Sequence, residues 1–558
     1  MIESITLKSG RNFGGEPTQF KAAPITIVVG PNNSGKSCLL REIGTFCQKG
    51  MKSNAHVLDN LSFHGLTTAE VNRALIEMEQ PVRPEEDMAL GHIRIGKPGT
   101  VKNVPHQHIE QCWTKPNDNP SFFCQYYLFF FTLILDGAGR TNLCRQQAAG
   151  DLQHPANSLA KLFTDDQLRQ KVRAIIYDAF GFYLVIDPSH VGQLRIRFSA
   201  VPPASNEQER GLHSAALDFH AGNTAVESTS DGVRVFTGII TEFMAGDPRV
   251  LVIDEPETFL HPTLQFKLGK QLAEAASATK KSIVAATHSS HFLMGCIQSG
   301  VPLNIVRLTH RNEIATSRLL ASQDILKLMR NPLLRSAGVL NGLFYDFVIV
   351  TEADTDRAFY QEINERLLMA ADSRGIPNVL FLNAQNKQTV RTIVAPLREI
   401  GVPAATIVDV DILKEGGSVW ANFLRAGNVP EIEISSLATL RADLASRLEE
   451  YRKKSGTDMK KSGGIDVLST DDREAARNLL DRLAKYGLFV VPTGELESWL
   501  KHLDVVGKGP RWLISMFERL GENPEAQSYI APSEGDVWDF LSDIGGWLSD
   551  EKRAGIPA

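Results

Sequence analysis

Cysteine is scarce in this sequence of 558 residues, and its spacing gives no sign of a zinc site. Six cysteines occur, and no two of them form the C-x-x-C pair that structural zinc sites commonly use. Scattered thiols in so long a chain fit a reducing compartment better than a disulfide framework. We therefore expect a cytoplasmic protein whose cysteines bind no metal.

The sequence also lacks the segments that direct a chain into or across a membrane. Its first ten residues, MIESITLKSG, do not have the basic stretch followed by an apolar one that a secretory signal requires. The most apolar run, residues 122–135, is shorter than the roughly 20 residues of a membrane-spanning helix. We expect this run to form a buried strand or helix, and we expect no membrane partner.

An excess of positive charge is missing as well. Lys and Arg number 59 against 65 Asp and Glu, so the formal net charge is −6. Because nucleic-acid binding depends on neutralising phosphates, this balance gives no overall attraction to DNA or RNA. A nucleic-acid substrate would have to be held by local basic patches and bound cations. Sustained heptads are absent too, which argues against a long coiled coil.

Short apolar runs alternate with helical patterns in two parts of the chain, which predicts an α/β fold with buried, mostly parallel sheets. The runs of the first part are residues 25–29, 250–253 and 282–286. Those of the second part are residues 347–351, 405–411 and the run that begins at residue 488. Between them, we expect inserted arms and a helical subdomain at about residues 50–220, and a loop at residues 452–473, which are rich in Lys, Gly and Asp.

A phosphate-binding loop follows the first apolar run. Residues 30–37, GPNNSGKS, match the pattern G-x-x-x-x-G-K-[ST], with a strand before it and a helix after it. Such a loop turns its backbone N–H groups toward the phosphates at the positive end of a helix. Lys36 would reach the outer phosphates of ATP, and Ser37 would bind Mg²⁺ through its hydroxyl. The residues expected to contact the nucleotide are Asn32, Asn33, Ser34, Gly35, Lys36 and Ser37.

Acidic residues complete this first site. Asp254 ends the apolar run at residues 250–253 and is expected to hold the Mg²⁺ shell, while Glu255 would orient or activate the attacking water. His288 follows the third run and is expected to sense the terminal phosphate. Either carboxylate alone would equally fit a strand that ends in solvent, and the loop at residues 30–37 is what favours a catalytic role.

Three further pairs of acids stand at or beyond the ends of the three apolar runs of the second part. Glu352 and Asp356 follow the first run, Asp409 and Asp411 form a D-x-D at the end of the second, and Glu495 and Glu497 follow the start of the third. Because parallel strands bring their carboxyl ends to one edge of a sheet, we expect the six side chains to lie together. Such a cluster repels itself unless cations neutralise it, and carboxylate oxygens suit Mg²⁺ or Mn²⁺. Two such ions can support cleavage of a phosphodiester.

The motifs of the first part resemble those of ABC-type ATPases of the group that includes RecF, SMC proteins and OLD-family nucleases. The resemblance rests on GPNNSGKS, on DEPETFLHP at residues 254–262 and on ATHSSHFL at residues 286–293. Residues 10–13, GRNF, resemble the turn that often opens such domains. The resemblance implies a homodimer, or a higher oligomer, in which ATP lies between two ATPase domains.

In that group the partner domain supplies a signature serine and glycine. Residues 228–232, STSDG, match this signature best, although they depart from the usual Leu-Ser-Gly-Gly. The resemblance therefore implies nucleotide contacts from Ser230 and Gly232. Gln125 is a weaker candidate for the glutamine of the Q-loop, and it would equally fit an interruption of a core strand.

The second set of acids resembles a Toprim domain, in which one acid after the first strand is joined by D-x-D and a further acid. With the ATPase motifs before this set of acids, the whole chain is similar to the OLD family of ATP-dependent nucleases. This resemblance implies an ATPase domain at residues 1–340 and a Rossmann-like Toprim domain at residues 345–558. The resemblance implies that the six acids bind metal and that Lys387 stabilises charge in the transition state. Toprim loops usually carry Gly after the first acid, where this sequence has Ala353.

The OLD resemblance implies cleavage of DNA in bacterial defence against phage. It also suggests a partner from the same defence system, such as the reverse transcriptase–DNA complex of a retron. An ATP-dependent clamp that binds nucleic acid or a partner protein without cleaving anything is the alternative. A Toprim primase or topoisomerase ranks below both, because we see neither an added zinc module nor a tyrosine on a DNA-binding module.

Overall fold

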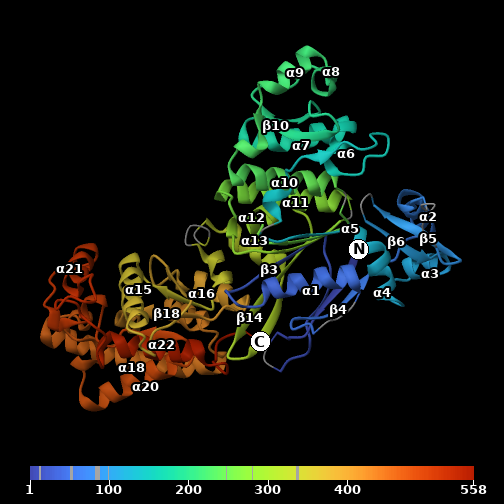
Figure 1. Ribbon diagram of the computed structural model, residues 1–558. Coiled ribbons are helices and arrows are strands. Elements are labelled where there is room, and N and C mark those ends of the chain that lie inside the picture. Colours follow the sequence, from blue (N-terminus) through green and yellow to red (C-terminus); the bar gives the residue numbers. More distant parts are fainter. Residues whose placement is uncertain are drawn as a thin grey trace. The chain divides into compact units, whose positions relative to one another are not determined.

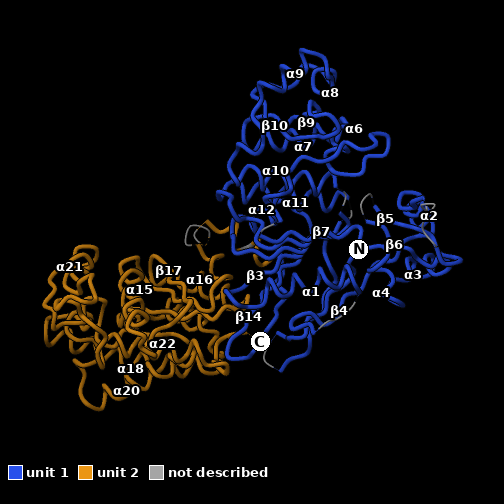
Figure 2. Tube along the Cα trace, viewed as in Figure 1, with its two compact units in different colours: residues 1–322 blue, residues 323–558 orange. Residues whose placement is uncertain are grey.

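A computed structural model describes the chain except for residues 12–13, 51–53, 82–87, 98–99, 138, 247, 280, 333, 335–337 and 558. Asn12 and Phe13 of the expected opening turn therefore lie outside the described residues. The chain forms two compact units, residues 1–322 and residues 323–558 (Figure 2). Each unit contains a buried hydrophobic cluster of its own. In the parts of the chain that the structure describes, no helix has the length and apolar composition to cross a membrane.

A six-stranded sheet forms the centre of unit 1. Its strands are, in order, β15 (Ile314–Leu320), β14 (Leu303–Arg311), β3 (Ile25–Val29), β13 (Ser282–Ala286), β12 (Val250–Asp254) and β7 (Thr132–Leu135). All neighbours pair in parallel except β14 and β15. Every residue of β3 and β13 is buried, as the unbroken apolar runs of these strands predict.

Helices cover both faces of this sheet. Figure 1 shows α1 (Lys36–Lys49) on one face and α10 (Asp231–Ala245), α11 (Pro262–Thr279) and α12 (Ser290–Gln298) on the other. The phosphate-binding loop joins β3 to α1, so it lies at the carboxyl end of a central parallel strand. Open α/β sheets bind their ligands at this edge.

Residues 50–220 are more than an inserted helical region. β7 belongs to the central sheet, and β4 (Leu58–Phe63) pairs with β1 (Ile2–Leu7), which also pairs with β2 (Gln19–Lys21). The other elements before β7 include a β5–β6 hairpin (His92–Lys97 and Thr100–Pro105), α2 (Thr68–Met78) and α3 (Ile109–Thr114). The expectation of an insertion over this whole range was therefore wrong, because two of its strands are part of the core.

The apolar run at residues 122–135 contains helix and strand together. It continues α4 (Pro120–Phe123) into the π-helical turn η2 (Cys124–Leu128), then α5 (Phe129–Phe131) and β7. Aromatic side chains of the run pack on one another, as Phe123 does on Tyr127 with ring centroids 5.3 Å apart. We expected a single strand or a single helix, and the run is a helical segment that leads into a strand.

After β7 the chain builds a subdomain with a second sheet. Its strands are β8 (Gln147–Ala148), β9 (Tyr183–Asp187), β10 (Gln193–Ser199) and β11 (Thr224–Ala225). Its helices are α6 (Ser158–Thr164), α7 (Asp166–Phe180), α8 (Asn206–Arg210) and α9 (Ser214–Ala221). The subdomain therefore combines helices with a sheet, whereas we expected inserted arms and a helical subdomain.

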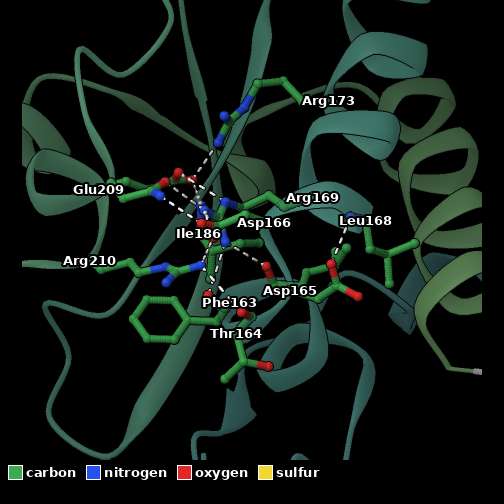
Figure 3. A network of polar contacts seen from close by, with 12 residues as sticks. Phe163, Thr164, Asp165, Asp166, Leu168, Arg169, Arg173, Ile186, Glu209 and Arg210 are labelled. Atoms are coloured by element: carbon green, nitrogen blue, oxygen red, sulfur yellow. Dashed lines mark hydrogen bonds and ion pairs between the residues drawn. The ribbon is translucent and has the colours of Figure 1, made fainter.

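A buried ionic network joins three elements of this subdomain. Figure 3 shows the Glu209 carboxylate between two guanidinium groups, 3.1 Å from Nε of Arg169 and 2.6 Å from Nη2 of Arg173. The backbone amide of Ile186 donates to the same carboxylate over 3.1 Å. Because an unpaired charge in the interior is strongly destabilising, these contacts fix α8 against α7 and β9.

Unit 2 contains a four-stranded parallel sheet with the order β17 (Val379–Asn383), β16 (Phe347–Thr351), β18 (Ala404–Val408) and β19 (Leu488–Val490). The longer helices of the unit are α15 (Asp354–Met369), α16 (Val390–Glu399), α17 (Gly417–Ala426), α18 (Glu431–Ser455), α20 (Thr470–Ala484), α21 (Pro510–Leu520) and α22 (Asp536–Ser549). α13 (Ser322–Arg330) begins at the boundary of the two units.

The expectation of a loop at residues 452–473 was wrong. Helix α18 extends to Ser455, the short helix α19 (Met459–Ser462) and the 3₁₀ turn η7 (Gly464–Val467) follow, and α20 begins at Thr470. Met459 is only 1% exposed, so its side chain anchors this segment in the interior. The polar composition of the segment as a whole gave no sign of this anchor.

Candidate functional site

The phosphate-binding loop has a backbone that requires a glycine at residue 30 and a left-handed residue at position 33. Gly30 has a φ of 147°, and a Cβ atom there would lie 2.1 Å from the carbonyl oxygen of Leu308. Asn33 is also left-handed, with a φ of 59°, a conformation that Asn tolerates better than most residues. The strand-loop-helix context that the motif requires is therefore present.

Lys36 is the first residue of α1 and is buried within the loop. Its Nζ atom donates to the carbonyl oxygen of Gly30 over 2.9 Å and to that of Pro31 over 2.6 Å. Ser37 is exposed, as are Asn32 and Asn33. The ammonium group of Lys36 therefore points into the loop, and the exposed polar side chains lie at the rim of the loop.

Asp254 and Glu255 lie at the end of β12, two strands from β3. The backbone amide of Glu255 donates to the carbonyl oxygen of Ala286 over 2.8 Å, and Glu255 has a left-handed φ of 49°. This backbone brings Oε1 of Glu255 to 4.0 Å from Nε2 of His288, which follows β13. The two predicted catalytic groups therefore face each other at one edge of the sheet.

The surroundings of His288 favour its neutral form. Burial and the positive charge of Lys36 lower the pKa of His288, while the charges of Glu255 and Asp254 oppose this shift. The backbone amide of His288 donates to Oε1 of Glu257 over 2.7 Å. Burial raises the pKa of Glu257. Sequence reasoning missed Glu257, although it stands three residues after Asp254 in the same motif.

Arg140 is a second residue that the sequence did not single out. Its guanidinium group donates to the backbone carbonyl of Glu255. Burial lowers the pKa of Arg140, and the charges of Glu257, Glu255 and Asp254 act against the shift. Its side chain therefore supports the turn that presents Glu255.

Ser230 and Gly232 open helix α10. Ser230 is the N-cap residue of α10, and its side chain makes no capping hydrogen bond. A Cβ atom on Gly232 would lie 2.7 Å from the carbonyl oxygen of Phe259, so the small residue lets the turn after β12 approach the helix. A contact between these residues and a nucleotide stays a prediction.

The Q-loop interpretation of Gln125 was wrong. Gln125 lies in η2, and its Nε2 atom donates to the carbonyl oxygen of Lys49, the last residue of α1. A helix of that length separates its ends by about 20 Å, and the phosphate-binding loop is at the other end. Gln125 is not a strand residue either. The residue that follows β7 is Asp136, which accepts a bond from the Gly139 amide over 2.9 Å.

In unit 2, the structure brings the predicted acids to one edge of the parallel sheet. Glu352 follows β16, Asp409 follows β18, and Glu495 lies beyond the end of β19. The backbone amide of Asp409 donates to Oε1 of Glu352 over 3.1 Å. The charges of Asp411 and Glu497 also act within this cluster, on Glu352 and on Asp356 respectively.

Burial and mutual repulsion make three of these carboxylates, those of Glu352, Asp356 and Asp409, hard to ionise. Burial, followed by the charge of Asp409, raises the pKa of Glu352 to about 8 and that of Asp356 to about 7. Burial raises the pKa of Asp409 as well, against the opposing charge of Lys460. Added positive charge would therefore stabilise the cluster.

Two lysines provide positive charge beside the D-x-D pair. Nζ of Lys460 lies 2.6 Å from Oδ2 of Asp409 and 3.5 Å from Oδ2 of Asp411. Nζ of Lys387 lies 3.2 Å from Oδ1 of Asp411 and 2.8 Å from Oε1 of Glu415. Burial alone would lower the pKa of Lys460, and the neighbouring carboxylates outweigh it and raise this pKa.

The third pair of acids has a different set of contacts. Nζ of Lys508 lies 2.7 Å from Oε1 of Glu495, and the amide of Gly509 donates to Oε1 of Glu497 over 2.9 Å. Sequence reasoning missed Lys508 and Lys460, since no motif marks either residue. Only the lysine-rich composition of residues 452–473 could have pointed to the latter.

Ala353 does not strain the turn where the family carries Gly. It is the N-cap residue of α15 with a φ of −129°, which any residue adopts. Its amide donates to Oδ2 of Asp356 over 2.9 Å, so one expected metal ligand also caps this helix.

The carboxylates do not form a ready-made chelate. Among the residues that the structure describes, no three acidic, histidine or cysteine side chains converge on a point that could hold one ion. The oxygen donors suit a hard divalent cation, and the ammonium group of Lys460 lies against two of them. Metal binding by the six acids stays a prediction.

Comparison with known families supports the first site. Residues 160–294 match the family described as "AAA domain, putative AbiEii toxin, Type IV TA system". The match covers less than half of the chain and contains Asp254, Glu255 and His288, whereas the phosphate-binding loop lies before it. No curated protein matches the sequence.

Among solved structures, the chain is similar to SMC head domains. One of them is an SMC head bound to the C-terminal winged-helix domain of ScpA, which is 13% identical. The match covers 58% of this chain and 99% of the SMC head, with a TM-score of 0.34. The SMC head domain from Thermotoga maritima is 13% identical, with coverages of 57% and 99% and a TM-score of 0.29. An SMC head from Pyrococcus furiosus with an extended coiled coil, bound to the C-terminal domain of ScpA, is 11% identical, with coverages of 59% and 98% and a TM-score of 0.28.

The family match and the strand-loop-helix geometry agree on the nature of unit 1. The loop at residues 30–37 and the residues after β12 and β13 lie at the carboxyl ends of neighbouring parallel strands. The prediction of an ATP-binding α/β domain is confirmed at this level. The chain contains a P-loop ATPase domain, followed by a unit built on a second parallel sheet.

Proposed function

We propose that this protein is an ATP-regulated, metal-dependent nuclease that cleaves DNA. The observation that carries the proposal is the gathering of acids from three adjacent parallel strands at one edge of unit 2. Glu352 and Asp409 are joined by a hydrogen bond of 3.1 Å, and the charge of Glu495 acts on Asp409. Buried carboxylates that repel one another are stabilised by cations, and Mg²⁺ and Mn²⁺ prefer such oxygen donors.

The residues that would hold the metal are Glu352, Asp356, Asp409, Asp411, Glu495 and Glu497. When bound, divalent ions activate water and stabilise the leaving oxygen of a phosphodiester. Lys387 lies beside Asp411 and would place a positive charge near the phosphate that is cleaved. We assign the residues from 345 onward to this nuclease domain and residues 1–340 to the ATPase domain, a boundary that lies after the division of the chain into compact units at residue 322.

In the ATPase domain, the ammonium group of Lys36 would exchange its loop carbonyls for phosphate oxygens of ATP. Ser37 and Asp254 would hold the accompanying Mg²⁺, and Glu255 would orient the attacking water. We further propose that two copies of the chain close on the nucleotide, with Ser230 and Gly232 of one copy facing the loop of the other. ATP binding would then control access to the carboxylate centre.

The family match favours a role in defence. The description of that family names a toxin and a toxin–antitoxin system. A nuclease controlled by ATP fits such a role, since an uncontrolled one would damage the host's own DNA. We therefore place the cleavage activity in defence against foreign DNA, with a regulatory partner from the same system.

The proposal is tested by incubating the purified protein with defined DNA and RNA, single- and double-stranded, in Mg²⁺ or Mn²⁺ and with or without ATP. Wild type should cleave DNA. Asp409→Ala should lose cleavage and keep ATP hydrolysis, whereas Lys36→Ala should lose ATP binding and the response to ATP. Failure of the wild type to cleave any substrate under every metal and nucleotide condition would refute the nuclease.

A second candidate function is an ATP-dependent clamp without nuclease activity. It is favoured by the ion pairs of the carboxylates, since Lys460, Lys387 and Lys508 neutralise part of the cluster without a metal. The acids would then stabilise the fold. Under this alternative, replacing Asp409 and Asp411 by Asn leaves ATP-dependent retention of DNA, and any biological activity, intact.

A further inference from the structure

We propose that Lys460 is an internal cation that competes with a divalent metal for Asp409 and Asp411. The inference rests on the proposed function, since it concerns the regulation of the same carboxylate centre. Nζ of Lys460 lies within 2.6 Å of one carboxylate and 3.5 Å of the other, so its charge bridges the D-x-D pair. A divalent ion shared by the two carboxylates would need the same space.

The backbone that carries Lys460 is held firmly at this place. A Cβ atom on Gly494, the residue before Glu495, would lie 2.3 Å from the carbonyl oxygen of Lys460. The amide of Val410, inside the D-x-D, donates to the carbonyl oxygen of Gly494 over 3.0 Å. The D-x-D turn, the turn at Gly494 and α19 therefore pack directly against one another. This packing holds the backbone of Lys460 beside the D-x-D pair.

Contacts of Asp458, the residue just before α19, also hold this helix in place. Oδ1 of Asp458 accepts from the amide of Lys460 over 3.0 Å, and Oδ2 of Asp458 pairs with Nζ of Lys414 at 2.5 Å. Met459 is buried beside them. With its backbone anchored, Lys460 can leave the carboxylates only by rotating its flexible side chain, which is 27% exposed and has solvent to move into.

This arrangement accounts for the lack of a ready chelate at the acids. Asp409 and Asp411 face an ammonium group, and a metal that replaces it must break two charge-assisted contacts. Lys460 would thus raise the concentration of Mg²⁺ or Mn²⁺ that the centre needs. It would also keep the acids neutralised when no metal is bound, which stabilises the resting protein.

The test is direct binding of Mn²⁺ to the full-length protein, followed by the electron paramagnetic resonance signal of the free ion. Lys460→Met removes the charge and keeps the length of the side chain. We expect it to bind Mn²⁺ about ten-fold more tightly than wild type, which corresponds to the loss of one charge-assisted hydrogen bond. Lys460→Arg, which keeps the charge, should stay close to wild type.

Lys461→Met is the matched control, because Lys461 is the exposed neighbour in the same short helix and carries the same charge. It should leave Mn²⁺ affinity unchanged. Equal or weaker Mn²⁺ binding by Lys460→Met, with normal binding by wild type, overturns the inference and leaves the nuclease proposal standing. If neither protein binds more Mn²⁺ than Asp409→Asn does, the metal centre itself is refuted, and the inference falls with it. Circular dichroism and thermal melts of each variant check that it is folded.

Discussion

The backbone amide of Asp409 donates a hydrogen bond to the side chain of Glu352 over 3.1 Å, and this bond joins the ends of β16 and β18. One carboxylate oxygen of Glu352 thus orders the turn that carries the next two acids, Asp409 and Asp411. The other oxygen remains for further contacts at the same edge. The first acid of the cluster therefore has a structural task as well as the proposed metal-binding one.

Glu352→Ala should loosen this turn, whereas Glu352→Gln should preserve it, because the amide oxygen of Gln can still accept the bond. We expect the backbone amide of Asp409 to exchange with deuterium about ten-fold faster in the Ala variant, as the loss of a single hydrogen bond would predict. Hydrogen exchange resolved to the peptides around residue 409 measures this. Equal protection in wild type and both variants would contradict the structural task of Glu352.

Glu255→Gln should stop ATP hydrolysis and leave ATP binding intact. The amide cannot take a proton from water, and loss of a general base lowers rates by about 100-fold or more. The backbone bond from Glu255 to Ala286 does not depend on the side chain, so the turn after β12 should keep its shape. Phosphate release and binding of a fluorescent ATP analogue check the two parts. Lys36→Met is the comparison, since it should lose both, and hydrolysis at the wild-type rate by Glu255→Gln would exclude its catalytic role.

Much of the core followed from sequence pattern alone. The runs at residues 25–29, 282–286 and 347–351 are entirely buried strands, as continuous apolar stretches without polar alternation indicate. The gathering of the acids followed from the same patterns, because each acid pair stands shortly after such a strand. Residues placed by a strand end can be located from sequence, since parallel strands share one direction.

The contacts that could not be predicted from the sequence come from segments that lack these continuous apolar stretches. Lys460 reaches Asp409 because Met459 is buried and Gly494 permits close approach, and neither fact is encoded in a local pattern. Gln125 was misplaced for a related reason. A run as apolar as residues 122–135 fits a buried strand and a buried helix equally well. Packing against distant segments decides which of the two each part of the run forms.

Lys387 should matter for chemistry more than for metal binding. Its ammonium group pairs with Asp411 and Glu415, and its side chain is 18% exposed. If it stabilises the transition state, Lys387→Met should slow DNA cleavage by about 100-fold or more, as removal of a positioned electrostatic group does. Mn²⁺ affinity, measured separately, should rise less than we expect for Lys460→Met, because Lys387 contacts only Asp411 of the D-x-D pair, whereas Lys460 contacts both carboxylates. Lys508→Met is the control, because Lys508 pairs with Glu495 from a more exposed position. A larger loss of cleavage in Lys508→Met would transfer the role to that lysine.

Asp187 should make the subdomain of unit 1 sensitive to acid. Burial alone would raise the pKa of Asp187, but hydrogen bonds from Ser189 and from Arg197, 2.6 Å away, outweigh it and lower this pKa to about 2. Because the value in an unfolded chain is near 3.8, the ionised group stabilises the fold above that pH, and its contribution disappears as the pH falls toward 2. Asp187→Asn should therefore lower the melting temperature at pH 5, and the difference from wild type should shrink as the pH approaches 2. Asp178→Asn, which replaces an exposed partner of Lys267, is the control and should change little at any pH. A gap between wild type and Asp187→Asn that stays constant from pH 5 to 2.5 would show that the carboxylate is not the acid-sensitive group.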